Sequence, residues 1–232
     1  MAGQIIAIGG GGFGRNPKEP IIEDYIVKTA SSKKPKVTFF PTASAENKDY
    51  IVNFYNAFSR LDCTFNHISL FQNTPNLDLI IDESDIIYIG GGNTKSMLSV
   101  FREWKLDQLL IKSYNDGKLL CGVSAGAICW FEKGITDSWE GDLRMLDCLN
   151  ILPGVCCPHY DGEVKRKPSV KKFIKNNQAS SILCIEDGAA IHYEGKNIKK
   201  AISFYPNKNV YDVSMADGSL IENSINKIDI SK

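Results

Sequence analysis

Short apolar runs alternate with longer amphipathic segments through the first half of the chain. The apolar runs have the length and composition of buried strands and lie at residues 4–8, 37–40, 65–70, 86–89 and 119–123. Apolar side chains recur at helical spacing at residues 19–31, 45–60, 94–104 and 106–115. Strands that alternate with amphipathic helices indicate βαβ units, so we expect an α/β protein with a mainly parallel central sheet.

The second half of the chain has shorter apolar runs, at residues 182–186, 189–193, 201–204 and 210–213. Tight turns between them are typical of antiparallel strands. The polar tail, residues 223–232, is expected to fray. No linker-like change in composition and no internal repeat divides the sequence, which predicts one domain over residues 1–232.

Charge and cysteine content narrow the class of protein. The 232 residues contain 27 Lys+Arg and 27 Asp+Glu, a balance that disfavours nucleic acid as a partner. No signal-peptide pattern begins the chain, and no apolar stretch approaches the ~20 residues that span a bilayer. The seven cysteines form no paired motif, and the three histidines lie far apart, so we expect no metal, no disulfides and a reducing cytoplasmic location.

Two glycine-rich turns follow predicted strands. Residues 9–14 formally satisfy G-x-G-x-x-G, but Asn16-Pro17 interrupts the helix that a dinucleotide site needs, and no carboxylate ends the second strand. We therefore expect a loop there and no cofactor. Residues 90–94 place backbone amides before a helix, where they could either bind an oxyanion or simply allow the helix to begin.

A third turn, Gly122-Val123-Ser124-Ala125-Gly126, carries the sharpest chemical signal. This G-x-S-x-G comes directly after a predicted strand and before an apolar segment, the context of a nucleophile elbow. Small residues on both sides permit the tight turn that exposes a serine hydroxyl. Ser124 is therefore the candidate nucleophile, and the N–H of Ala125 would face a developing oxyanion.

A nucleophilic serine needs a base and an acid that orients it. His159 is favoured by its place at the end of an apolar run, whereas His67 and His192 fall inside predicted strands. Glu186 and Asp187 end another predicted strand, although Asp187-Gly188 is also a hairpin-turn signal. The sequence leaves the choice of acid open.

Taken together, four motifs in this order resemble the peptidase E family of serine peptidases, which includes the cyanophycinases. They are 89–94 (IGGGNT), 122–127 (GVSAGA), Pro158-His159 and 186–188 (EDG). The resemblance covers roughly residues 4–204. It implies a three-layer α/β sandwich similar to class I glutamine amidotransferases, with a serine at the elbow in place of a cysteine.

The resemblance also implies roles for individual residues. Ser124 would be the nucleophile and His159 the general base, while Gly92 and Ala125 would supply the oxyanion-hole amides. Asp187 matches the acid of the triad, with Glu186 and Asp137 as alternative acids. The implied reaction is acyl transfer from a small peptide, without a cofactor.

The resemblance does not determine which substrate the protein would cleave. The best-known family activity removes an N-terminal aspartate from dipeptides, which calls for a cation near the site. The candidates are Arg144, Lys165, Arg166 and Lys167. Two alternatives remain: a cyanophycinase-like hydrolase of β-aspartyl peptides, and a glutamine-amidotransferase-like binding module without peptidase activity. Cys121 lies within a predicted strand and is expected to be a core residue, and the oligomeric state is not readable from the sequence.

Overall fold

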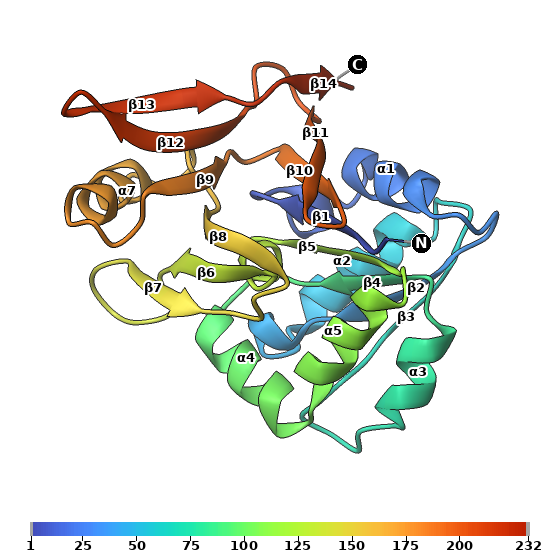
Figure 1. The fold of residues 1–232 in the computed structure, drawn as a ribbon. Helices are drawn as coiled ribbons and strands as arrows, with labels where there is room; N and C mark the ends of the chain where they lie inside the picture. Colours follow the sequence, from blue (N-terminus) through green and yellow to red (C-terminus); the bar gives the residue numbers. More distant parts are fainter. Residues whose placement is uncertain (1, 231–232) are drawn as a thin grey trace.

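The larger of two β-sheets has eight strands in the computed structural model, which describes residues 2–230 (Figure 1). Its strands run in the order β14-β11-β10-β1-β5-β4-β2-β3. They are β1 (Gln4–Ile8), β2 (Lys36–Phe40), β3 (Thr64–His67), β4 (Ile86–Ile89), β5 (Leu119–Val123), β10 (Ala189–Glu194), β11 (Asn197–Ser203) and β14 (Lys227–Asp229). The five strands from β1 to β3 are mutually parallel, and β10 is antiparallel to both of its neighbours, β1 and β11.

Helices cover both faces of this sheet because its central strands are apolar on both sides. In β1, Ile6 and Ile8 pack in one core with α1 (Ile21–Thr29) and α2 (Lys48–Phe58). Ile5 and Ala7 point to the other core, which is built with α3 (Leu77–Glu83), α4 (Thr94–Glu103) and α5 (Leu106–Asn115). The period-two alternation of a strand produces this division. The expected three-layer α/β architecture is confirmed.

A second sheet of six strands was not foreseen from the sequence. Its order is β13-β12-β9-β8-β6-β7. The strands are β6 (Phe131–Thr136), β7 (Arg144–Asp147), β8 (Leu152–Cys157), β9 (Ser181–Ile185), β12 (Val210–Ala216) and β13 (Ser219–Ser224). Helix α7 (Arg166–Lys175) packs on it through a separate apolar core that includes Val170, Ile174 and Val213.

The structure corrects two expectations about the second half of the chain. The apolar runs at 182–186 and 189–193 are not a hairpin: β9 belongs to the smaller sheet and β10 to the larger, so the chain crosses between sheets at Asp187. The polar tail is also not frayed over residues 223–230, because β14 pairs in parallel with β11. Residues 231–232 lie outside the described part of the chain.

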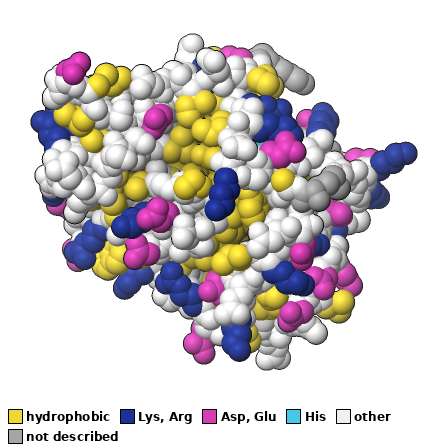
Figure 2. Space-filling model, viewed as in Figure 1, with side chains coloured by type: hydrophobic (Ala, Val, Ile, Leu, Met, Phe, Trp, Pro, Cys, Tyr) yellow, Lys and Arg dark blue, Asp and Glu magenta, His cyan; other side chains and the backbone are white. Residues whose placement is uncertain are grey.

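On the face seen in Figure 1, apolar side chains gather near the middle, with acidic and basic side chains interspersed around them (Figure 2). This mixture agrees with the equal numbers of positive and negative residues. Among the described residues, every helix is too short or too polar to cross a lipid bilayer.

Candidate active site

The turn that carries Ser124 joins β5 to the short helix α6 (Ala125–Ile128). Ser124 has a positive φ of 56°, an uncommon backbone conformation for a residue with a side chain, and its N–H donates to the carbonyl of Ile8 at 3.0 Å. A methyl group on Gly126 would overlap the carbonyl oxygen of Ile89 in β4. The glycine therefore lets α6 approach the sheet closely enough to hold the serine in this conformation.

His159 and Asp187 come from the smaller sheet, each just beyond the carboxyl end of a strand. They follow β8 and β9, which are parallel neighbours with Cys157 opposite Cys184. Parallel strands end at the same edge of a sheet, so the two polar side chains lie side by side although 28 positions separate them in sequence. The second sheet thus delivers both partners to the elbow of the first.

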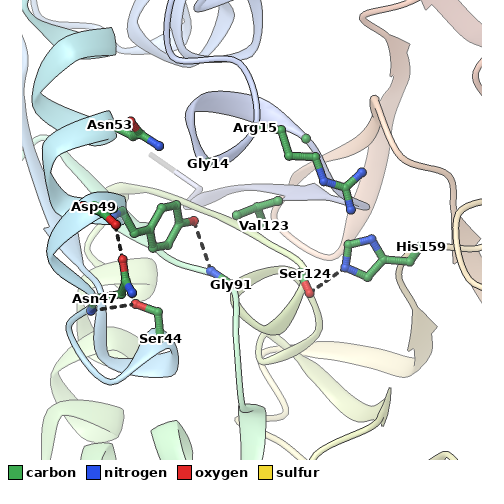
Figure 3. Close-up of a pocket in the computed structure, with 12 residues that line it drawn as sticks. Gly14, Arg15, Ser44, Asn47, Asp49, Asn53, Gly91, Val123, Ser124 and His159 are labelled. Atoms are coloured by element: carbon green, nitrogen blue, oxygen red, sulfur yellow. Dashed lines mark hydrogen bonds between the residues drawn. The ribbon is translucent and has the colours of Figure 1, made fainter.

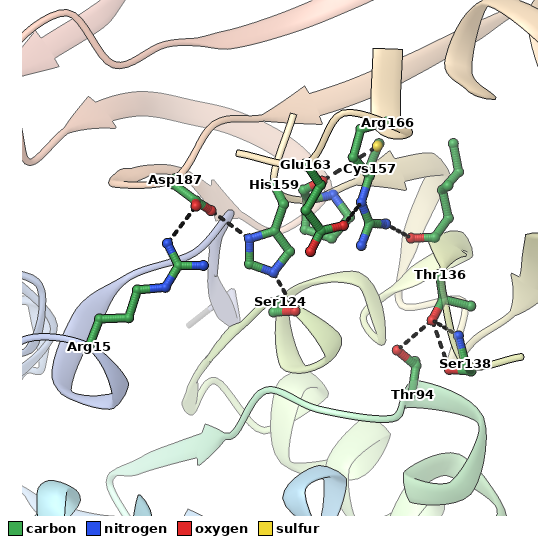
Figure 4. A network of polar contacts seen from close by, with 12 residues as sticks. Arg15, Thr94, Ser124, Thr136, Ser138, Cys157, His159, Glu163, Arg166 and Asp187 are labelled. Carbon is green, nitrogen blue, oxygen red and sulfur yellow. Dashed lines mark hydrogen bonds and ion pairs between the residues drawn. The ribbon is translucent and has the colours of Figure 1, made fainter. Parts of the chain in front are cut away.

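Ser124, His159 and Asp187 form a continuous chain of hydrogen bonds (Figure 4). Ser124 Oγ lies 2.8 Å from His159 Nε2, and His159 Nδ1 lies 2.5 Å from Asp187 Oδ1. Such an arrangement lets the imidazole accept the serine proton while the carboxylate fixes the ring and stabilises its positive charge. The structure brings together all three residues that the resemblance implied.

Asp187 makes an ion pair and a hydrogen bond with residues that could not be predicted from the sequence. Arg15 Nη1 pairs with Asp187 Oδ2 at 2.6 Å, and the Asp187 N–H donates to Asp161 Oδ1 at 2.9 Å. Asp161 is itself paired with Lys208. A methyl group on Gly10 would overlap Asp187 Oδ1, so the loop after β1 must be glycine here for the carboxylate to fit.

These contacts determine the charge of the carboxyl group. Burial raises the pKa of Asp187, but the hydrogen bonds and charge interactions with His159 and Arg15 outweigh burial and hold the pKa at about 2. The group is therefore an anion throughout the neutral range, as an orienting acid must be.

The two alternative acids lie elsewhere. Glu186 turns away from the imidazole and accepts the N–H of Asn209 at 2.8 Å, and burial raises its pKa. Asp137 is exposed after β6 and lines a cavity beside Ser124, but it has no contact with His159 among those that the described residues make. Geometry thus favours Asp187 over both.

The remaining histidines and Cys121 are remote from this chain of hydrogen bonds. His192, in β10, is buried between Gln4 and the hydroxyl of Tyr25, and burial lowers its pKa to about 4. His67 contacts the hydroxyl of Tyr55. Cys121 is fully buried within β5, and burial raises its pKa well above the usual thiol value, which makes it a poor nucleophile.

The amides of Gly92 and Ala125, which the resemblance implies form an oxyanion hole, both lie beside Ser124. Gly92 follows β4 with φ 137° and lines a cavity with Ser124, and Ala125 directly follows the serine. Neither amide donates to a protein group within the described chain, residues 2–230. A side chain on Gly92 would overlap the Ala43 carbonyl, so only glycine fits.

Two cavities meet at Ser124. The first has a volume of about 420 Å³ and is lined by His159, Arg15, Gly91 and residues at the start of α2 (Figure 3). The second, about 250 Å³, is lined by Gly92, Asn93, Asp137, Ser138, Glu163 and Arg166.

Of the four cations considered from the sequence, Arg166 alone lines a cavity that contains Ser124, as far as the described residues show. Its side chain is 2% exposed, and it donates to Glu163 at 2.7 Å and to the Ile135 carbonyl at 2.7 Å. Arg144 lies over the ring of Trp139 and Lys167 over that of Tyr160, while Lys165 donates to the Gly141 carbonyl.

All seven cysteines are free thiols. Within residues 2–230, no group of three or more His, Cys, Asp or Glu side chains is arranged to hold a metal ion.

The fold is an α/β architecture consistent with class I glutamine amidotransferases, and it carries a serine that is hydrogen-bonded to a histidine at a strand-to-helix turn. Residues 5–201 match the model of peptidase family S51, and the chain belongs to that family. It is 42% identical over 221 residues to the uncharacterized peptidase YgaJ of Bacillus subtilis, covering 94% of this chain and 95% of the relative. Peptidase E of Actinobacillus pleuropneumoniae serotype 7 is 28% identical over 182 residues, covering 72% and 75% of the two chains.

Solved structures share the fold. A peptidase E-type protein from Listeria monocytogenes superposes with a TM-score of 0.62 at 23% identity, over 85% of this chain and 97% of the other. A peptidase from an acI-B1 Actinobacterium has a TM-score of 0.68 at 17% identity, over 98% and 95%. The expected family and fold are thereby confirmed, and the protein is a peptidase by family.

Proposed function

We propose that the protein is a serine-type exopeptidase that hydrolyses short peptides through Ser124, His159 and Asp187. The single observation that carries this proposal is the unbroken hydrogen-bond chain from the serine hydroxyl through the imidazole to the carboxylate. A pure binding module has no need for such a chain beside a strained serine. Family membership supplies the peptide substrate class.

Acylation begins when His159 Nε2 takes the proton of Ser124 as Oγ attacks the peptide carbonyl carbon. The amides of Gly92 and Ala125 receive the negative charge of the tetrahedral oxygen. His159 then returns the proton to the leaving nitrogen, the C–N bond breaks, and the N-terminal part remains as an ester on Ser124.

Deacylation repeats these roles with water. His159 removes a proton from the water molecule as its oxygen attacks the ester carbonyl, and the Ser124 oxygen leaves with the proton held by the imidazole. Asp187 keeps its negative charge in both stages and stabilises the imidazolium. The free thiols of all seven cysteines support a reducing compartment such as the cytoplasm.

The cavity beside Gly92 favours an N-terminal aspartyl residue as the acyl part. Arg166 lies there as a buried cation whose Nη2 makes no hydrogen bond among the described residues, so it can bind the β-carboxylate. Glu163 and Asp137 line the same cavity and can bind the α-amine. Cationic and anionic side chains together in so small a cavity match a free N-terminal amino acid better than the interior of a long chain.

The test is a survey of dipeptides with each amino acid before leucine, together with N-acetylated and β-aspartyl versions of the aspartyl peptide. Products are measured by mass spectrometry for the wild type and Ser124→Ala. We expect cleavage of peptides with a free N-terminus, aspartyl-leucine foremost, and none by Ser124→Ala.

Each other result changes a different part of the proposal. Cleavage of the β-aspartyl peptide alone would assign the cyanophycinase-like alternative. Cleavage of the N-acetylated peptide would contradict recognition of a free N-terminus. A folded wild-type protein that cleaves nothing would favour the non-peptidase alternative.

A further inference from the structure

The two cavities at Ser124 are not equivalent, because only the larger one is lined by His159. In serine hydrolysis the imidazole must deliver a proton to the leaving nitrogen. The part of the peptide that leaves therefore extends into the cavity that contains His159, while the acyl part occupies the cavity beside Gly92 and Arg166. This assignment rests on the proposed function.

Among the described residues that line the leaving-group cavity, Arg15 is the one with a positively charged side chain of lysine or arginine type. The side chain is 61% exposed, and only Nη1 is engaged, with Asp187 Oδ2 at 2.6 Å. A guanidinium presents five N–H donors in a planar fork. Most of these donors remain available to a ligand in the cavity.

The backbone of Arg15 is held firmly although its side chain is exposed. Phe13 is fully buried, stacks on Tyr50 and donates its N–H to Glu23 Oε1 at 2.8 Å. The N–H of Arg15 donates to the Gly12 carbonyl at 3.0 Å. The loop thus aims the guanidinium toward His159 (Figure 3).

The surroundings favour a small anion at the Arg15 end of the cavity. Asp49 is the one acidic residue among the described residues that line this cavity. It lies at the start of α2, on the opposite side of the cavity from Arg15 (Figure 3). Arg15 lies near the imidazole of His159, because the carboxylate of Asp187 contacts both side chains. A group bound by Arg15 therefore lies close to the scissile bond.

We propose that Arg15 binds the C-terminal carboxylate of the leaving amino acid and so restricts the enzyme to dipeptides. The two carboxylate oxygens can accept hydrogen bonds from the free N–H groups of the guanidinium, while Nη1 keeps its contact with Asp187. A longer peptide places an uncharged amide where the carboxylate belongs. Arg15 is then a specificity residue for the leaving group, on the opposite side of Ser124 from Arg166.

The experiment compares three leucine substrates that share the N-terminal residue best cleaved in the survey: the dipeptide acid, its C-terminal amide and the tripeptide with a second leucine. Values of kcat/KM are measured for the wild type, Arg15→Ala, Arg15→Lys and Lys165→Ala. Lys165 is an exposed cation that lines neither cavity, which makes it the matched control. Any effect of Arg15 on Asp187 acts on all three substrates equally and cancels in their ratio.

We expect the wild type to favour the acid over the amide by roughly 10- to 100-fold, the usual range for a hydrogen bond to a charged group. Arg15→Ala should bring this ratio close to one, Arg15→Lys should restore part of it, and Lys165→Ala should leave it unchanged. A wild type that cleaves the amide and the tripeptide as well as the acid, or an Arg15→Ala variant that keeps the ratio, would overturn the inference. Absence of any Ser124-dependent cleavage would instead refute the proposed function, and the inference with it.

Discussion

At the scale of single residues, Asp187 is distinguished from neighbouring acids by what it contacts. Its carboxylate lies between His159 and Arg15, its N–H donates to Asp161, and its pKa is held at about 2. Glu186, one position earlier, is committed to the N–H of Asn209. Adjacent carboxylates therefore have separate roles, one in the site and one in joining strands of the smaller sheet.

This separation predicts opposite outcomes for two conservative substitutions. Asp187→Asn should lower kcat by roughly 10²- to 10⁴-fold, because an amide can hold the imidazole in the wrong tautomer and cannot stabilise its positive charge. Glu186→Gln keeps an acceptor for Asn209 and should retain activity near that of the wild type. Steady-state kinetics on the best dipeptide measures both, and a larger loss in Glu186→Gln than in Asp187→Asn would contradict the assignment.

Ser124 and His159 could be proposed from the sequence because each stands in or beside a local motif, but the residues left the acid open, and only the family resemblance favoured Asp187 over Glu186 and Asp137. Arg15 could not be predicted in the same way, because its contact with Asp187 spans 172 positions and depends on the chain crossing from one sheet to the other. Gly10 was read only as part of a flexible loop. Its requirement for glycine comes from the Asp187 carboxylate, which sequence alone does not place beside it.

At the scale of elements, the elbow depends on close contact between α6 and β4. Gly126 stands where a methyl group would overlap the Ile89 carbonyl oxygen, so a side chain there would push the two elements apart and displace Ser124. The strained φ of Ser124 is maintained by this packing and by the bond from its N–H to Ile8.

Gly126→Ala should therefore lower both stability and activity. Overpacking against backbone in a buried turn is expected to cost about 3 kcal/mol of the free energy of unfolding, with a parallel loss of kcat as Ser124 shifts. Gly218→Ala is the control, since its Cβ would meet open space and the positive φ alone costs about 1 kcal/mol. Urea unfolding and kinetics check this, and equal stability of the two variants would be evidence against it.

Most elements of the first half were predictable because strand and helix periodicities there alternate cleanly, although the short helix α3 was not among the predicted ones. The smaller sheet was missed for a physical reason. β8 contains Pro153 and Gly154, and β7 is only four residues long with a charged residue at each end, so neither has the apolar pattern of a buried strand. The turn signal at Asp187-Gly188 was genuine, but it marks a crossing between sheets, which local turn chemistry does not distinguish from a hairpin.

At the scale of the whole molecule, the site lies where the two sheets meet. The larger sheet presents the serine and the amides proposed to bind an oxyanion, and the smaller sheet presents His159 and Asp187. Catalytic geometry therefore depends on global folding. One buried group in the larger sheet's helical layer is Glu23, which anchors the loop after β1 while its second oxygen, Oε2, has no hydrogen-bond partner in the described structure.

Glu23 should make stability depend on pH. Burial raises the pKa of Glu23 from 4.5 to about 7. Its hydrogen bonds with backbone groups lower the pKa, but their effect is smaller than that of burial. Below pH 4.5 the carboxyl is protonated in both states; between pH 4.5 and 7 the unfolded chain loses its proton first, so folding stability falls as the pH rises. At about 1.4 kcal/mol per pKa unit, the cost above pH 7 is roughly 3 kcal/mol.

The variant Glu23→Gln keeps the acceptor for the Phe13 N–H and removes the charge. It should be more stable than the wild type at pH 8 and equally stable at pH 4, as measured by the free energy of unfolding in urea. His192, whose pKa is lowered to about 4, opposes the trend below its ordinary value of 6.5. Because His192 is present in both proteins, its contribution cancels in the difference between their free energies of unfolding. If this difference does not change with pH, the role given to Glu23 is wrong.

The account depends most on Ser124 being the group that attacks the peptide. The most direct test is kcat/KM for the best dipeptide in the wild type and in Ser124→Ala, with circular dichroism showing that both are folded. We predict a loss of about 10⁴-fold or more, because removal of the nucleophile leaves only binding and the oxyanion amides. A folded Ser124→Ala protein that retains the wild-type kcat/KM would contradict the account.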